Sequence, residues 1–178
     1  MEEIINKIKE WGNRTKLRIN GTLQAQGLKL ISEYGEVVNG ILKNDPKEIK
    51  DGIGDMFVVM FMLEGIFQNE FKTSKELEFP SAVFSFTRSD NKTKILIITE
   101  KLGNLTDAIL KKQNNIIDIM SNIAEDLVEL AHINGFTIEE CLIHAYNDIK
   151  DREGILTPDG VFVKSTDPEY TRIKKIYG

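Results

Sequence analysis

Cysteine, proline, long apolar runs and basic blocks are all scarce in this chain of 178 residues, which has one cysteine and four prolines. The single Cys141 excludes an intramolecular disulfide framework and a zinc site built from cysteines. No stretch approaches the roughly 20 apolar residues that span a bilayer. The net charge is −5, and no cluster of Lys and Arg is present to neutralise phosphates along a nucleic acid. We therefore expect a cytoplasmic protein that binds neither membranes nor nucleic acids.

The composition is that of a folded domain, with 41% apolar and 29% charged residues. Apolar residues recur at helical spacing through most of the chain, so the predicted fold class is all-α. We expect residues 1–178 to form a single domain, a helical bundle of two helix hairpins with a small C-terminal extension. The expected segments are a metal-binding helix pair, a connector, a second helix pair plus a terminal helix, and the extension, over residues 24–67, 68–93, 94–153 and 154–178.

The link between the first two long helices is very short, which predicts an antiparallel hairpin. Asp45 is the expected N-cap of the second helix, with Pro46 at the first helical position. Glu48, three residues after the cap, completes a capping-box pattern. The stretch from Met56 to Leu63 is apolar on every side, which predicts burial.

Later segments carry weaker structural signals. Thr137 and Glu140 form a second capping-box pattern, which opens a helix expected to run to about Arg152 and to end at Gly154. Residues 157–160 read as a turn before a small hairpin. Residues 82–86 alternate in polarity and fit either a strand or a packed loop.

A weak internal repeat relates the two helix pairs. Residues 35–43 resemble residues 103–111 at a shift of 68, and a shift of 67 aligns Asp55 with Asn122. The second pair is either a degenerate copy, which keeps the shape and loses the charge, or an unrelated hairpin that aligns by chance. If the second helix pair is a copy of the first, it either takes the place of a partner subunit within one chain or forms part of a homo-oligomer. The oligomeric state therefore stays open.

Polar side chains gather on one face of each helix in the first hairpin, because each residue turns about 100° around the axis. The first helix presents Gln26, Lys29, Glu33 and Glu36. The second presents Glu48, Asp51 and Asp55. Such pairs of acids often belong to a solvent-exposed helix face. Asp55, however, directly precedes the apolar stretch of its helix, so we expect it to be buried. A buried carboxylate without a partner is costly in free energy. The constellation therefore predicts a site for Mg²⁺, with Mn²⁺ as a substitute.

These residues resemble the MazG-like all-α nucleoside triphosphate pyrophosphohydrolases. The pattern is Gln26-x-x-Lys29-x-x-x-Glu33-x-Gly35-Glu36, followed by Asp51-Gly52-Ile53-Gly54-Asp55. The resemblance implies that Glu33, Glu36 and Asp55 hold Mg²⁺ against the phosphates of a nucleotide. The family's remaining Glu is replaced here by Gly52, and we expect Asp51, one turn from Asp55, to take its place rather than Glu48.

The resemblance extends to residues 145–152, where the family has a late cluster that contacts phosphates and sugar. It implies that Asn147, Lys150 and Arg152 bind substrate together with Gln26 and Lys29. Lys150 would also act in catalysis, with Glu33, Glu36 and Asp55. Cations near the end of a helix are favoured in any case, so a purely structural role for this cluster is the alternative.

The function expected from these features is Mg²⁺-dependent hydrolysis of (deoxy)nucleoside triphosphates to monophosphate and pyrophosphate. The alternative is a catalytically inactive helical module that binds a nucleotide or another protein, for which Gly52 is the main support. Trp11 is expected in the core rather than as a platform for a base. Metal-dependent release of pyrophosphate distinguishes the two functions.

Overall fold

Helices make up most of the structure, a computed structural model that describes residues 1–79 and 90–177. The elements are α1 (Glu2–Arg14), α2 (Leu17–Asn20), α3 (Leu23–Lys43), α4 (Pro46–Phe71), α5 (Asn91–Leu110), α6 (Ile116–Ile133), α7 (Ile138–Ile149), β1 (Gly154–Leu156), β2 (Phe162–Lys164) and α8 (Tyr170–Tyr177). The prediction of an all-α helical bundle is confirmed. Among the described helices, none combines the length and apolar character that crossing a bilayer requires.

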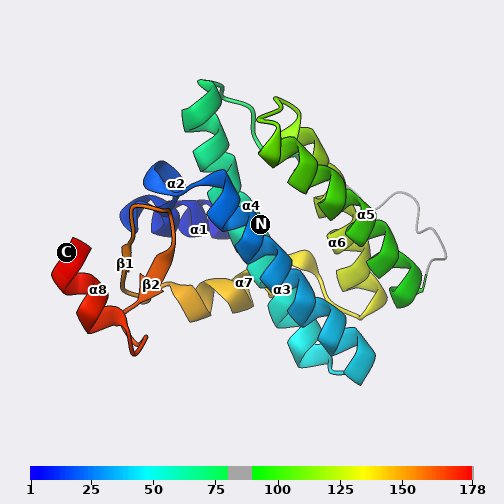
Figure 1. The fold of residues 1–178 in the computed structure, drawn as a ribbon. Helices are drawn as coiled ribbons and strands as arrows, with labels where there is room; N and C mark the ends of the chain where they lie inside the picture. The colour runs from blue at the N-terminus through cyan, green and yellow to red at the C-terminus, as the bar shows by residue number, and fades with distance from the viewer. Residues whose placement is uncertain (80–89, 178) are drawn as a thin grey trace.

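The helix α4 is the centre of the bundle. Every residue from Met56 to Phe67 is buried, as predicted for the apolar stretch, and α4 contacts α1, α2, α3, α6 and α7. In Figure 1, α3 and α4 cross the middle of the molecule, with α5 and α6 on one side and α1, α2 and the β-hairpin on the other. The surface of α4 that α3 leaves free is therefore shared between the two flanking groups.

The junction of α3 and α4 is set by local backbone chemistry. Asn44 adopts the left-handed conformation that ends α3 (φ 53°), and Asp45 Oδ1 accepts hydrogen bonds from the N–H groups of Lys47 and Glu48 at 3.0 and 3.2 Å. The predicted N-cap is thus confirmed. The reciprocal half of the capping box is not made, because the Glu48 carboxylate lies 3.2 Å from the Lys43 ammonium instead.

Two helix-interior glycines bring α3 and α4 into close contact. A Cβ on Gly40 would lie 2.8 Å from the backbone nitrogen of Ile49, and a Cβ on Gly52 would lie 2.7 Å from Val37 Cγ2. Glycine within a helix is disfavoured by about 1 kcal/mol relative to Ala. Here it permits a backbone approach that any side chain would prevent, so the hairpin packs antiparallel and tightly.

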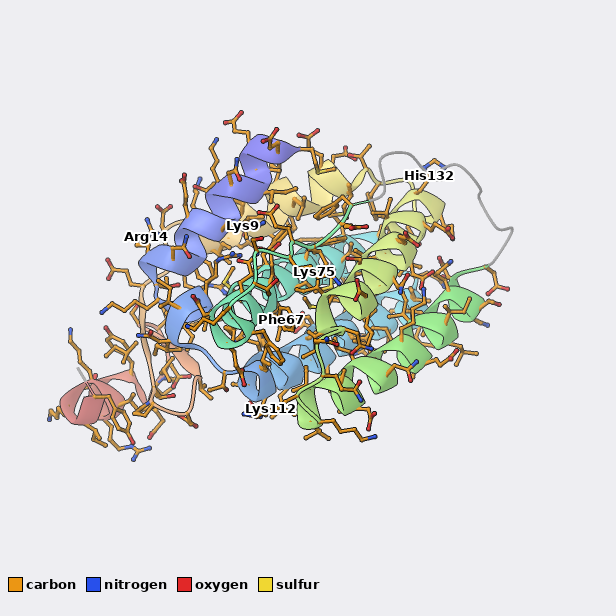
Figure 2. All side chains as sticks on the ribbon, turned by 90° about the horizontal axis from the view of Figure 1, so that it is seen from above. Lys9, Arg14, Phe67, Lys75, Lys112 and His132 are labelled. Atoms are coloured by element: carbon orange, nitrogen blue, oxygen red, sulfur yellow. The ribbon has the colours of Figure 1, made fainter. Side chains whose placement is uncertain are left out.

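The second hairpin stacks on the first, α5 on α3 and α6 on α4. Lys94 Nζ lies 2.9 Å from Asp126 Oδ1 in the α5–α6 interface, and the Tyr34 hydroxyl of α3 donates to the Ile95 carbonyl at 2.6 Å. Figure 2 shows this hairpin on the far side of the molecule from α8, with Lys75 between α4 and α6, where it pairs with Asp118. The internal duplication stays a prediction.

The connector is shorter than expected. The helix α4 continues past residue 67 to Phe71, whose ring stacks on Phe67 with centroids 4.4 Å apart. At the other end α5 begins at Asn91, capped by Asp90. The stretch 82–86, predicted as a strand or a packed loop, lies outside the described residues.

The C-terminal part requires a correction. The Thr137–Glu140 capping box is confirmed, but α7 ends at Ile149 rather than near Arg152. Gly154 does not cap the helix. It begins β1 and pairs with Lys164 of β2, where a side chain would collide with Phe162. The small predicted hairpin is confirmed, with residues 157–160 in the turn between β1 and β2, whereas α2 and α8 were not predicted.

Candidate active site

The hairpin register decides which residues of α3 and α4 face each other. Gly40 faces Ile49, and Gly52 faces Val37. In both pairs the two residue numbers add up to 89, as expected for one antiparallel register. Continued at 1.5 Å per residue, this register places Glu33 within one residue of the level of Asp55, and Gln26 within one residue of the level of Met62. The two acids of the sequence pattern therefore meet at one level, and the amide of Gln26 lies about 10 Å further along the hairpin axis.

A cavity of about 360 Å³ opens along this face, between α3, α4, the end of α7 and the β-hairpin. Its wall contains five of the predicted site residues: Gln26, Lys29, Glu33, Asp55 and Arg152. Most of the remaining wall is apolar or aromatic, from Trp11 on α1 to Phe162 on β2. Residues far apart in the chain, such as Gln26 and Arg152, are thus brought to one site.

The carboxylates at one end of the cavity repel each other. Burial raises the pKa of Asp55 to about 7, and the negative charges of Glu33 and Asp51 act in the same direction. The pKa of Glu36 is raised as well, mainly by burial and then by the charge of Glu33. Four predicted ligands therefore share one electrostatic environment, in which a divalent cation would relieve the repulsion. We call Glu33, Glu36, Asp51 and Asp55 the acid end.

Only two members of the acid end, Glu33 and Asp55, line the cavity itself. Asp51 lies beside it, where its Oδ1 atom is 3.2 Å from Nε2 of His144. His144, Asp148 and Asp51 place one potential ligand atom each within 4.8 Å of one another. His144 was not predicted at the site, because it lies on α7 and only the fold brings it to Asp51.

Three cations face the acid end. Lys29 pairs with Glu33 one helical turn away, and Arg152 lines the cavity close enough to oppose the rise in the pKa of Asp55. The third, Lys164 on β2, was missed by sequence reasoning. Burial lowers the pKa of Lys164, and the positive charges of Arg152 and Lys29 lower it further. The small hairpin predicted from the turn at residues 157–160 was the one signal that pointed to this segment.

Two predicted substrate-binding residues do not reach the cavity. Asn147 is exposed on α7, and the Lys150 ammonium donates to its side-chain oxygen at 3.2 Å. Lys150 lines a separate surface depression with Arg14. The reason is the early end of α7, since the chain turns after Ile149 and directs only Arg152 inward. The structure therefore places Asn147 and Lys150 outside this cavity, and their role in substrate binding stays a prediction.

The position of the family's missing Glu is sterically closed. A Cβ on Gly52 would lie 2.7 Å from Val37 Cγ2 and 3.0 Å from the backbone nitrogen of Val37. A glutamate at this position could not be accommodated without separating α3 from α4. Neither Glu48 nor Asp51 lines the cavity, but the charge of Asp51 acts on Asp55 and Glu36, whereas Glu48 pairs with Lys43. Asp51 is therefore the nearer candidate for the vacant role.

Comparison with known proteins gives one informative match. Over 63 residues, 35% of this chain, the sequence is 43% identical to an uncharacterized 18.2 kDa protein from the rep-hol intergenic region of Haemophilus phage HP1. The match spans 39% of the length of that protein. No family model matches the chain, and no solved structure matches it significantly. The similarity to a phage protein assigns no activity.

The stability of the metal-free protein should depend on pH through Asp55. Its ordinary pKa is 3.8 and its folded pKa is about 7, so between these values the folded state binds more protons than the unfolded state. The contribution of this carboxyl is complete below about pH 4 and falls as the pH rises through 7. Asp55→Asn should therefore melt at least about 2 °C above the wild type at pH 8 in chelator, with the difference closing toward pH 4.

Thermal melts of the two proteins from pH 4 to 8 check this expectation, with Asp107→Asn as the exposed control. Parallel curves for the wild type and Asp55→Asn would contradict the electrostatic description of the acid end.

Proposed function

We propose that the protein hydrolyses nucleoside triphosphates to a nucleoside monophosphate and pyrophosphate in the presence of Mg²⁺. The observation that carries this proposal is one cavity lined by Glu33 and Asp55 together with three cations, Lys29, Arg152 and Lys164. Carboxylates that hold a metal and cations that bind phosphate are the two elements that this hydrolysis requires. The resemblance to MazG-like enzymes supports the same reaction.

The acid end fits a hard divalent cation. Its predicted ligands offer only oxygen atoms, and burial together with neighbouring negative charge raises the pKa of Asp55 and of Glu36. Glu33, Glu36 and Asp55, with Asp51, would hold Mg²⁺ or its substitute Mn²⁺. Such an ion, when bound, supplies charge neutralisation at phosphate and a more acidic water.

The protein's own side chains have separate tasks in this proposal. Lys29, Arg152 and Lys164 orient the triphosphate and balance charge on the leaving pyrophosphate. The apolar wall limits the water that reaches the phosphates. A carboxylate of the acid end that is not engaged with the cation orients the attacking water and accepts its proton. No side chain needs to act as a nucleophile.

A second candidate is a catalytically inactive module that binds a nucleotide. The specific observation in its favour is Gly52, where the family glutamate cannot fit. The products distinguish the two. Equal amounts of nucleoside monophosphate and pyrophosphate support hydrolysis, whereas nucleotide binding without turnover supports the inactive module.

Lys164→Ala should raise the KM for the nucleotide by about tenfold or more, because a charge-assisted contact to phosphate is lost. Lys150→Ala should change KM less than twofold, since Lys150 lies outside the cavity. Steady-state kinetics of both variants at saturating Mg²⁺ provide the measurement. A larger effect at Lys150 than at Lys164 would favour the assignment made from the sequence over the one made from the cavity.

A further inference from the structure

The end of the cavity away from the acids has a different chemistry. Met62 is within one residue of the level of Gln26 in the hairpin register, and Gly12 packs directly against Met62, which brings Trp11 of α1 to this end. The Trp11 ring meets the Phe162 ring edge to face, with centroids 6.0 Å apart. Both rings line the cavity together with Val58 and other apolar side chains. We call this region the aromatic end.

The β-hairpin is fixed against the same end. Its turn residue Gly160 has a positive φ of 86°, and a Cβ there would lie 2.7 Å from the backbone nitrogen of Thr22. The Thr22 hydroxyl donates to the Asp159 carbonyl at 3.2 Å. Since Thr22 is the N-cap of α3, the hairpin turn rests on the start of the helix that carries Gln26. The aromatic end is therefore enclosed by rigid elements.

One polar side chain at this end is left without a partner. Gln26 is only 4% exposed and lines the cavity, and its amide forms no hydrogen bond to any residue in the described part of the chain. Its amide atoms are not among the fully buried polar atoms without a partner, so the amide is open to the cavity and available to a ligand. The indole N–H of Trp11 also lacks an acceptor within the described residues. A ligand that seats here can satisfy the Gln26 amide.

We propose that the aromatic end is a nucleobase subsite, in which the base lies against Trp11 and Phe162 and its edge exchanges hydrogen bonds with the Gln26 amide. A planar heterocycle with a donor and an acceptor side by side satisfies both the apolar wall and the amide. A bare polyphosphate would leave the wall uncovered, and an alkyl chain would leave the amide unpaired. This inference rests on the proposed function. It adds to that function the residues that recognise the base of the nucleotide.

The spacing of the two ends supports the assignment. Gln26 precedes Glu33 by seven residues, which is about 10 Å along the helix axis. Lys29 lies between them, within one residue of the level of Val59 in the hairpin register. A nucleotide spans a comparable length from its α-phosphate to the edge of its base. The phosphates then lie at the acid end while the base lies at the aromatic end.

The fluorescence of Trp11 offers a direct test, because it is the only tryptophan in the chain. The probes are α,β-methylene analogues of the four deoxynucleoside triphosphates, which resist hydrolysis, and tripolyphosphate, which has no base. We expect at least one analogue to change the emission of Trp11, and tripolyphosphate to bind in calorimetry without that change. Equal emission changes with tripolyphosphate would overturn the subsite.

Gln26→Leu should weaken binding of the preferred analogue by about tenfold or more and leave the tripolyphosphate affinity unchanged. Without ligand, the variant should melt at or above the wild-type temperature, because it replaces an unpaired amide in a largely apolar wall with an apolar side chain. Gln24→Leu, an exposed position on α3, is the matched control. Gln26→Met provides a second, unbranched replacement if Leu disturbs the helix packing.

The outcomes separate the two levels of the proposal. Unchanged analogue affinity in both Gln26 variants, or a melting temperature well below wild type in both, would overturn the nucleobase subsite and leave the hydrolysis intact. An equal loss of analogue and tripolyphosphate affinity would overturn it too. Absence of binding by every analogue and by tripolyphosphate to the wild type would refute the proposed function itself.

Discussion

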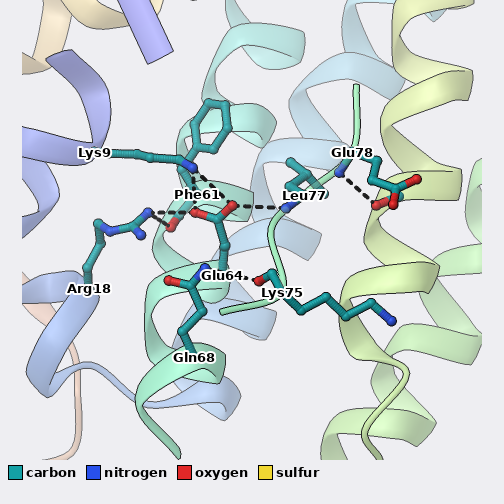
Figure 3. Close-up of polar contacts among 9 residues, drawn as sticks. Lys9, Arg18, Phe61, Glu64, Gln68, Lys75, Leu77 and Glu78 are labelled. Atoms are coloured by element: carbon teal, nitrogen blue, oxygen red, sulfur yellow. Dashed lines mark hydrogen bonds and ion pairs between the residues drawn. The ribbon is translucent and has the colours of Figure 1, made fainter. Parts of the chain in front are cut away.

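Glu64→Ala should lower the free energy of unfolding by about 3–5 kcal/mol, because it leaves buried cations without their counter-charge. Glu64 is completely buried on α4. Its carboxylate lies 2.9 Å from Lys9 Nζ and 3.0 Å from Arg18 Nη1, and it accepts the backbone N–H of Leu77 at 2.9 Å. Figure 3 shows these contacts converging on the one side chain from α1, α2 and the segment after α4.

The prediction is checked by chemical denaturation of Glu64→Ala beside Glu70→Ala. Glu70 lies on the same helix and pairs with Lys112 at the surface, so its loss should cost at most about 1 kcal/mol. The triple variant Lys9→Met, Arg18→Met, Glu64→Met should recover much of the loss, since it removes all three charges together. Equal stability of Glu64→Ala and Glu70→Ala would contradict the role of Glu64.

Glu64 also connects stability to the cavity. The cations that it binds belong to α1 and α2, the two helices that supply Trp11 and Leu17 to the cavity wall. If α1 packs less tightly, Trp11 at the aromatic end shifts, while the carboxylates of the acid end on α3 and α4 keep their positions. We therefore attribute any rise in KM in Glu64→Ala to the wall rather than to the chemistry.

Glu33→Gln should reduce kcat/KM for the nucleotide by about 10³-fold, the loss expected when several kcal/mol of charge stabilisation are removed from the transition state. Glu33 is 3% exposed, lines the cavity and raises the pKa of both Asp55 and Glu36 by its charge. The substitution keeps the shape of the side chain and removes a proposed metal ligand.

Two measurements separate a lost ligand from a disturbed fold. Calorimetric titration with Mn²⁺ should show weaker binding to Glu33→Gln, while the melting temperature in chelator should equal or exceed that of the wild type, because repulsion at the acid end is relieved. Asp107→Asn, exposed on α5, should change neither quantity. Wild-type Mn²⁺ affinity in Glu33→Gln would contradict the assignment of metal ligands.

Local chemistry made much of the first hairpin predictable. Asp45 and Asn44 define the junction of α3 and α4 through caps that depend on neighbouring residues alone. The burial of residues 56–63 follows from an apolar stretch that has no polar face. Helical spacing also placed Glu33 and Asp55 on facing sides of a short-linked pair. Each of these features depends on a few residues close in sequence.

The remainder of the site depends on contacts between distant segments. Lys164 reaches the cavity because Gly154 begins a strand instead of ending a helix, which also explains why Lys150 and Asn147 lie outside. Trp11 was expected in the core, and it is indeed 5% exposed, but its place in the cavity wall depends on the packing of α1 against α4. Periodicity along one helix carries no information about such neighbours.

Release of pyrophosphate from deoxynucleoside triphosphates is the most direct test of the proposed function. The purified protein is incubated with each of the four nucleotides in Mg²⁺ or in excess chelator, beside Glu33→Gln prepared in the same way. The account predicts equal amounts of monophosphate and pyrophosphate from at least one nucleotide, only with Mg²⁺ and only with the wild type. Turnover that persists in chelator or in Glu33→Gln, or absence of turnover with every nucleotide in Mg²⁺, would contradict it.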